Sequence, residues 1–145
     1  MSVSLLDVNV LIALFDPAHV HHDRAHEWFG RNRKNGWASC PVTIRGCIRV
    51  LSSPAYPTVE TSPSEVIAHL RIFCRDSHHE AWPDSVSLLE ETLFRCGMIS
   101  SLGALTDIYL LGLAVSRHGK LATFDGSISL SPVVGAMPRN IEVIH

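Results

Sequence analysis

Residues 3–16 read VSLLDVNVLIALFD, and this stretch decides the fold of the chain. Two polar residues, Asp7 and Asn9, interrupt a run that is otherwise almost wholly apolar. A buried carboxylate without a partner is energetically costly, so Asp7 requires hydrogen bonds or a cation. Residues 3–6 are short, apolar and partly β-branched, which is typical of a buried parallel strand, and residues 9–15 have a helical pattern. The stretch therefore predicts a strand and then a helix, with a polar pair where they meet.

Short apolar runs alternate with helical patterns along the rest of the chain. Further strands are expected at residues 37–40, 80–82, 121–124 and 141–144, and further helices at residues 21–33, 42–51, 63–75, 86–95 and 107–116. This alternation predicts one α/β domain over residues 1–145, with a central, mostly parallel sheet of about four to five strands. Right-handed crossovers would place helices on both faces of that sheet.

Two helix starts have local signals. Ser62, Pro63 and Glu65 fit a capping box, with the serine as N-cap, the proline at the first helical position and the glutamate at the third. Thr106 is expected to be the N-cap of a helix that begins at Asp107.

Composition indicates a globular chain without a membrane segment. The 145 residues are 46% hydrophobic and 18% charged, and no apolar run approaches the roughly 18 residues that a membrane helix needs. There is no basic segment at the start that would indicate a secretory signal. The four scattered cysteines contain no C-x-x-C pair, which favours reduced, buried thiols in a cytoplasmic protein.

The formal net charge is −2, so a nucleic-acid partner would have to be held by local basic patches. Arg31, Arg33 and Lys34 form one such patch. Arg45 and Arg49 are four residues apart and would share one helix face. The alternative at both places is an ordinary solvated surface.

The predicted strands and helices place three aspartates at one edge of the sheet. Asp7 and Asp125 each end a strand, and Asp107 lies in the first turn of a helix. Ligands of open parallel sheets bind outside the carboxyl ends of the strands. Taken singly, each acid has a simpler explanation. Asp7 could accept hydrogen bonds from the following loop, Asp125 could be an ordinary turn residue, and Asp107 could be favoured by the helix dipole. Together they predict an oxygen-ligand site for Mg²⁺ or Mn²⁺.

The same residues carry a family resemblance. LLDVNVLIALFD (5–16), CPVT (40–43) and LTDIYLLGLAVSRHGKLATFD (105–125) resemble the PIN-domain ribonucleases, and in particular the VapC-type toxins of bacterial toxin–antitoxin pairs. The similarity extends to HVHHDRAHEWF (19–29), RVLSSPAY (49–56) and HHEAWPD (78–84), and therefore covers nearly the whole chain.

The resemblance implies a function and a set of roles. It implies hydrolysis of RNA phosphodiester bonds with Mg²⁺ or Mn²⁺, neutralisation by a small antitoxin, and a homodimer. Asp7, Asp107 and Asp125 become metal ligands and catalytic residues by position. Asn9 becomes a group that orients Asp7 or a bound water, and Thr123 becomes a candidate for a supporting hydrogen bond.

One position departs from the family pattern. The family carries a glutamate just after the PVT of the second βα unit, and Ile44 occupies that position here. No other acid lies between Glu27 and Glu60, so no neighbour can take its place. Arg45 adjoins it, and could pair with an aspartate, clamp the substrate phosphate, or point to solvent. A second hypothesis is therefore a catalytically impaired PIN-like protein that retains antitoxin or RNA binding.

Other chemistry has weaker support. The histidines of HVHHDRAH include a pair four residues apart, His22 and His26, which is the spacing of a two-histidine metal face. We favour a surface helix start over a metal site there, and the roles of His19 and His21 stay open. The chain lacks the G-K-[ST] ending of a phosphate-binding loop, so a nucleotide-binding regulator is a distant third hypothesis.

Overall fold

Five parallel strands form one central sheet. The structure is a computed structural model that describes residues 2–145. In the order β3-β2-β1-β4-β5, every neighbouring pair of strands is parallel. In chain order the strands are β1 (Ser4–Leu6), β2 (Trp37–Ser39), β3 (His79–Ala81), β4 (Lys120–Thr123) and β5 (Ile141–Val143).

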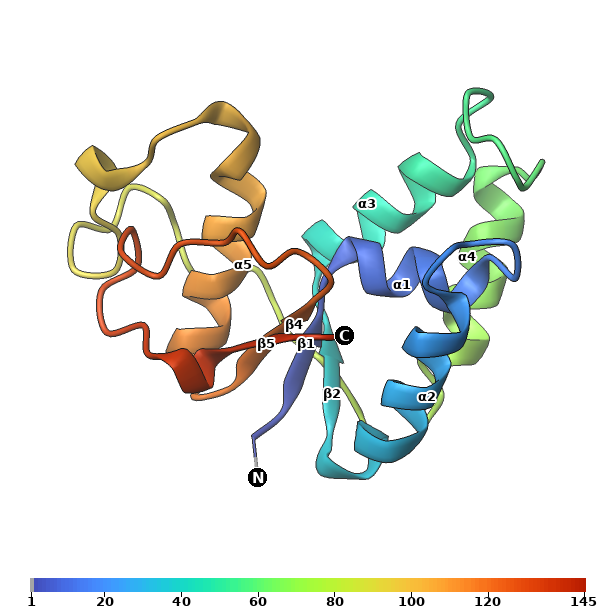
Figure 1. The fold of residues 1–145 in the computed structure, drawn as a ribbon, viewed down its shortest axis with the longest axis horizontal. Helices are drawn as coiled ribbons and strands as arrows, with labels where there is room; N and C mark the ends of the chain where they lie inside the picture. Colours follow the sequence, from blue (N-terminus) through green and yellow to red (C-terminus); the bar gives the residue numbers. More distant parts are fainter. Residues whose placement is uncertain (1) are drawn as a thin grey trace.

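Helices cover both faces of the sheet (Figure 1). Helices α1 to α4 lie on one side and α5 on the other; their bounds are Val8–Phe15, His22–Asn32, Pro41–Leu51, Pro63–Phe73 and Leu105–Ser116. Side chains alternate along a strand, so Leu6 joins the core beneath α1 to α4 while Leu5 joins the core beneath α5. The predicted α/β class, with a parallel sheet between helices, is confirmed.

The order of the strands fixes where a site can form. Strand β1 lies between β2 and β4. The chain therefore adds β2 and β3 on one side of β1, and later adds β4 and β5 on the other side. The register pairs Leu6 with Ala122, which brings the carboxyl ends of β1 and β4 together. This reversal of strand order is the position where open α/β sheets bind ligands.

The helix expected at residues 86–95 was wrong. This segment consists of turns and a single bridge between Phe94 and Val133. Leu89 is 90% exposed, so a helix here would have no continuous apolar face to bury. The Phe94 ring instead packs against Gly112 of α5, and this tertiary contact outweighs the local helical pattern.

Two smaller predictions also need correction. Thr106 is not an N-cap, because a 3₁₀ turn at Leu102–Ala104 leads directly into α5, which already begins at Leu105. Cys96 is exposed and Cys74 is only partly buried, whereas all four cysteines were expected to be buried.

The N-cap at Ser62 is confirmed. Its hydroxyl accepts a hydrogen bond from the Glu65 amide at 3.3 Å, with Pro63 at the start of α4. The Glu65 carboxylate accepts from the Thr61 hydroxyl at 3.1 Å. No helix within residues 2–145 has the length and apolar character needed to cross a bilayer.

Candidate active site at the carboxyl edge of the sheet

Asp7 is the most buried of the three aspartates. Its side chain is only 4% exposed and caps the start of α1, where Oδ1 accepts a hydrogen bond from the Val8 amide at 2.7 Å. Oδ2 accepts from the Thr123 hydroxyl at 2.7 Å. These two bonds, one from α1 and one from β4, fix the carboxylate at the junction of β1 and β4.

The Thr123 hydroxyl joins three residues of the site. Besides donating to Asp7, its oxygen accepts from the Asn9 side-chain amide at 3.2 Å and from the Asp125 backbone amide at 3.0 Å. The Asn9 side-chain oxygen accepts from the Phe124 amide at 3.3 Å. Asn9 therefore acts on Asp7 through Thr123, and it also ties α1 to the segment that follows β4.

Asp107 and Asp7 have raised pKa values. Burial, and then the negative charges of Asp7 and Asp125, raise the pKa of Asp107 to about 6. Burial is also the largest cause of the raised pKa of Asp7, which the Asp125 carboxylate raises further. The three carboxylates are therefore close enough to repel one another, and both shifts would be opposed by a cation bound among them.

Asp125 has a different environment. Its Oδ1 accepts hydrogen bonds from the Ser127 amide at 2.8 Å and from the Ser127 hydroxyl at 2.6 Å. These two bonds hold the pKa of Asp125 below its usual range. The pKa of Asp125 is thus lowered where the pKa values of its two neighbours are raised, and the sequence had not indicated Ser127 as its partner.

The donor chemistry of the three acids suits a hard divalent cation, which prefers carboxylate oxygens. Within residues 2–145, however, no three histidine, cysteine, aspartate or glutamate side chains are grouped as metal ligands. One Asp125 oxygen is occupied by Ser127. Coordination of a single ion by all three acids would therefore require their side chains to move closer together.

Ile44 and Arg45 lie at the start of α3. Ile44 is partly buried and packs against the core beneath α1. Arg45 is exposed and pairs with no carboxylate within residues 2–145, so of the three alternatives for Arg45 the structure does not show the pairing with an aspartate. Arg45 and Arg49 instead line a groove of about 610 Å³, which Thr106 of α5 also borders.

His22 and His26 form hydrogen bonds with backbone carbonyls at the end of α1. The Nδ1 of His22 donates to the Ala13 carbonyl at 2.7 Å, and the Nε2 of His26 donates to the Leu14 carbonyl at 2.8 Å. Carbonyls in the last turn of a helix lack partners within that helix. The pair therefore caps α1 and fixes α2 against it.

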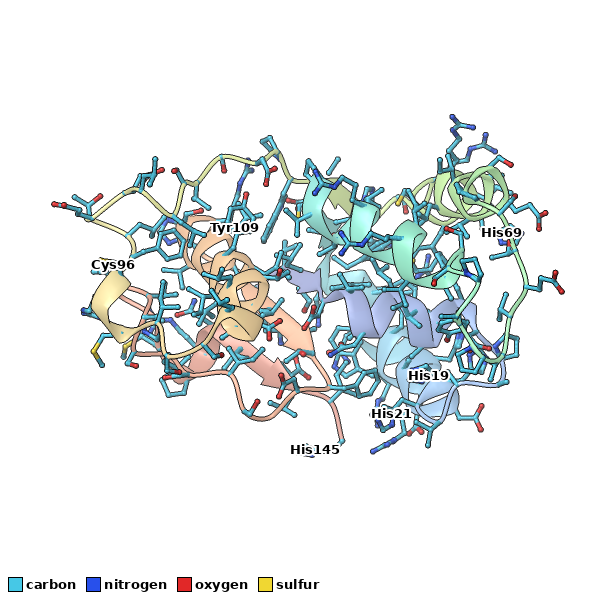
Figure 2. The ribbon with its side chains drawn as sticks, turned by 90° about the horizontal axis from the view of Figure 1, so that it is seen from above. His19, His21, His69, Cys96, Tyr109 and His145 are labelled. Atoms are coloured by element: carbon cyan, nitrogen blue, oxygen red, sulfur yellow. The ribbon has the colours of Figure 1, made fainter. Side chains whose placement is uncertain are left out.

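His21 contacts the residue that precedes Asp125. Its ring stacks on Phe124, with ring centroids 4.5 Å apart and an interplanar angle of 18°. Phe124 directly precedes Asp125 in the chain. Viewed from above, His19 and His21 lie beside α2 and Tyr109 lies on α5 (Figure 2).

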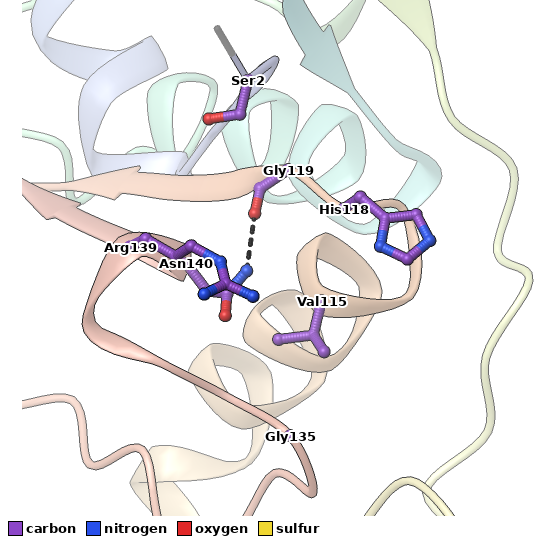
Figure 3. A pocket seen from close by; sticks show the side chains of 7 residues that line it. All are labelled: Ser2, Val115, His118, Gly119, Gly135, Arg139 and Asn140. Carbon is purple, nitrogen blue, oxygen red and sulfur yellow. Dashed lines mark hydrogen bonds between the residues drawn. The ribbon is translucent and has the colours of Figure 1, made fainter.

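A cavity of about 300 Å³ lies away from this site (Figure 3). It is bordered by Gly119, which precedes β4, and by Ser2, which precedes β1, so it lies at the amino ends of the strands. The Asn140 side chain closes one side by donating to the Gly119 carbonyl at 3.0 Å. None of the three aspartates lines it.

Comparison with known proteins identifies the family. No family model matches the chain. Ribonuclease VapC44 of Mycobacterium tuberculosis is 41% identical over 144 residues, which cover 97% of this chain and 99% of the relative. Ribonuclease VapC39 of the same organism is 39% identical over 132 residues (91% and 95%), and Ribonuclease VapC38 is 35% identical over 126 residues (87% of each). The chain belongs to the VapC ribonuclease family.

Proposed function

We propose that the chain is a metal-dependent endoribonuclease toxin whose site comprises Asp7, Asp107 and Asp125. The observation that carries this proposal is the convergence of the three carboxylates where the strand order reverses: Thr123 bonds both Asp7 and the Asp125 backbone, and Asp107 and Asp125 line one cavity. The ribonuclease names of the relatives support the reaction class. Mg²⁺ or Mn²⁺ bound there would polarise a phosphoryl oxygen and acidify a water molecule.

The chain's own residues have separable tasks in this proposal. Thr123 and the Val8 amide hold the Asp7 carboxylate in place. Asp107, which lines the same cavity as Asp125, would supply a further carboxylate oxygen to the cation. The exposed Arg45 guanidinium can contact a substrate phosphate from the neighbouring groove.

The test is cleavage of an RNA oligonucleotide with Mg²⁺ or Mn²⁺ by the wild-type protein and by Asp7→Asn. Asparagine is also a good N-cap, so the variant retains the hydrogen bond from the Val8 amide and the start of α1. We expect cleavage to fall at least a hundredfold while the circular dichroism spectrum is unchanged. Equal cleavage by both proteins would exclude this site.

A second candidate is an impaired nuclease that retains antitoxin or RNA binding. Ile44 favours it, because an isoleucine packed against the core cannot supply a metal ligand. Under this alternative, Ile44→Glu raises RNA cleavage well above the wild-type rate. Strong cleavage by the wild-type protein would exclude it.

The proposed partners follow from the same family. We propose a homodimer that acts in the cytoplasm and is neutralised by a protein antitoxin. Light scattering on the purified chain measures its oligomeric state. Co-purification with the product of a short reading frame directly upstream tests for the antitoxin.

A further inference from the structure

A second cavity, of about 430 Å³, opens beside two of the aspartates. Asp107 and Asp125 form part of its lining. Five serines from two separate loops share the lining with them: Ser100, Ser101, Ser127, Ser129 and Ser131. The volume lies within the range of about 300–1,000 Å³ that is usual for ligand pockets. We refer to this cavity as the serine pocket.

The lining excludes an anion as the preferred occupant. It contains two carboxylates and no lysine, arginine or histidine. Its remaining wall is largely apolar and includes Met98, Ile108 and Ile128. A ligand that fits this lining has flat apolar faces together with neutral hydrogen-bonding edges, because serine hydroxyls both donate and accept.

We propose that the serine pocket binds the base and ribose of one nucleotide of the RNA, beside the phosphodiester bond that the aspartates cleave. This inference rests on the proposed nuclease function and adds a substrate subsite to it. Single-stranded RNA presents unstacked bases that proteins bind through their faces and edges. Those are the groups that the apolar wall and the hydroxyls complement.

The groove of Arg45 and Arg49 provides the complementary contact. Thr106 borders that groove and Asp107 borders the serine pocket, so consecutive residues at the start of α5 separate the two. The arginines would contact phosphates, whereas the serines would contact an uncharged part of a nucleotide. The substrate would thus cross the aspartates between the basic groove of Arg45 and Arg49 and a serine pocket that contains no basic residue.

The serines differ in how readily they can be tested. Ser127 donates to Asp125, so replacing it would disturb an acid of the site. Ser129 and Ser131 share a hydrogen bond of 2.9 Å within their loop. Ser100 and Ser101 are exposed and lie outside these bonds. Their replacement by alanine removes two hydroxyls from the pocket at little expected cost to the fold.

The experiment measures binding independently of cleavage. A fluorescein-labelled single-stranded RNA pentamer of mixed sequence is titrated into the Asp7→Asn protein, with and without Ser100→Ala and Ser101→Ala together. We expect the double replacement to raise the Kd about 4- to 100-fold, because each of the two lost hydrogen bonds is worth roughly a factor of 2 to 10. The dependence of log Kd on log salt should keep its slope, since Ser100 and Ser101 carry no charge and neutralise no phosphate.

Two control variants make the result specific. Ser77→Ala replaces an exposed serine before β3, at the opposite edge of the sheet, and should leave the Kd unchanged. Arg45→Ala should raise the Kd. It should also make the dependence of log Kd on log salt shallower, by about the amount expected for the loss of one phosphate contact.

An unchanged Kd for the double alanine variant would overturn the serine pocket, even if the wild-type protein cleaves RNA. A raised Kd with a shallower salt slope would also overturn it, because the replacements would then have disturbed the contacts between the arginines and phosphates. A raised Kd with an unchanged slope, in a protein whose wild type does not cleave RNA, would support the pocket and refute the proposed nuclease.

Discussion

Replacing Asp107 with asparagine should stabilise the metal-free protein at alkaline pH. The pKa of Asp107 is raised from 3.8 to about 6, so ionising this carboxyl is less favourable in the folded chain than in the unfolded chain. Two units of pKa correspond to about 3 kcal/mol, and partial exposure of the side chain reduces the usable effect to about 1–2 kcal/mol. An acid in the first turn of a helix also gains up to about 1 kcal/mol from the helix dipole, which partly offsets the benefit of its removal.

The sign of the pH dependence follows from the same shift. The folded protein binds more protons than the unfolded chain between pH 3.8 and about 6, so the Asp107 contribution to stability is lost as pH rises through that window. Asp107→Asn should match the wild type near pH 4 and exceed it by about 1 kcal/mol at pH 8. The asparagine has no proton to lose and no charge to repel Asp7.

The assay is urea unfolding in EDTA at several pH values, followed by circular dichroism. Asp23→Asn is the matched control, because Asp23 is the first-turn acid of α2 and is exposed. This control should be slightly less stable than the wild type. An Asp107→Asn protein that is no more stable than wild type at pH 8 would refute the electrostatic account of the site.

Two further substitutions test the packing around the site. Gly112→Ala should lower the free energy of unfolding by about 1–3 kcal/mol, because the added Cβ would lie 2.3 Å from the Cζ of the buried Phe94 ring. The control Gly30→Ala, whose Cβ meets nothing within 4 Å, should be neutral or stabilising in the same urea titration. Thr123→Val keeps the shape of a fully buried side chain but removes the hydrogen bond to Asp7, and should cost about 2–4 kcal/mol. A thermal denaturation curve unchanged by that substitution would contradict the role given to the Thr123 hydroxyl.

The local sequence was sufficient to place the three aspartates relative to the strands and helices. Asp7 and Asp125 follow apolar strands directly, and the carboxyl ends of parallel strands share one edge. Asp107 was correctly placed in the first turn of its helix, although the helix begins two residues earlier than expected. These predictions needed only the apolar pattern and the residue that ends each run.

Contacts between distant segments could not be predicted in the same way. The hydrogen bond from Thr123 to Asp7 spans 116 positions in the chain, and no local pattern indicates it. Asp16, at the end of the opening stretch, is buried, and the hydrogen bond of 2.5 Å that it accepts from Tyr56 compensates for the lost contact with water. The helix expected at residues 86–95 was wrong for the same reason, since Phe94 packs against Gly112, which lies on a helix further along the chain.

The central claim is that Asp7, Asp107 and Asp125 bind a divalent cation that is needed for RNA cleavage. Its most direct test is the rate at which the EDTA-treated wild-type protein cleaves an RNA oligonucleotide as Mn²⁺ is added. We expect no cleavage without the metal, a saturable rise as Mn²⁺ increases, and no rise for Asp125→Asn. Cleavage that is equally fast in EDTA, or a rise that Asp125→Asn shares with the wild type, would contradict the claim.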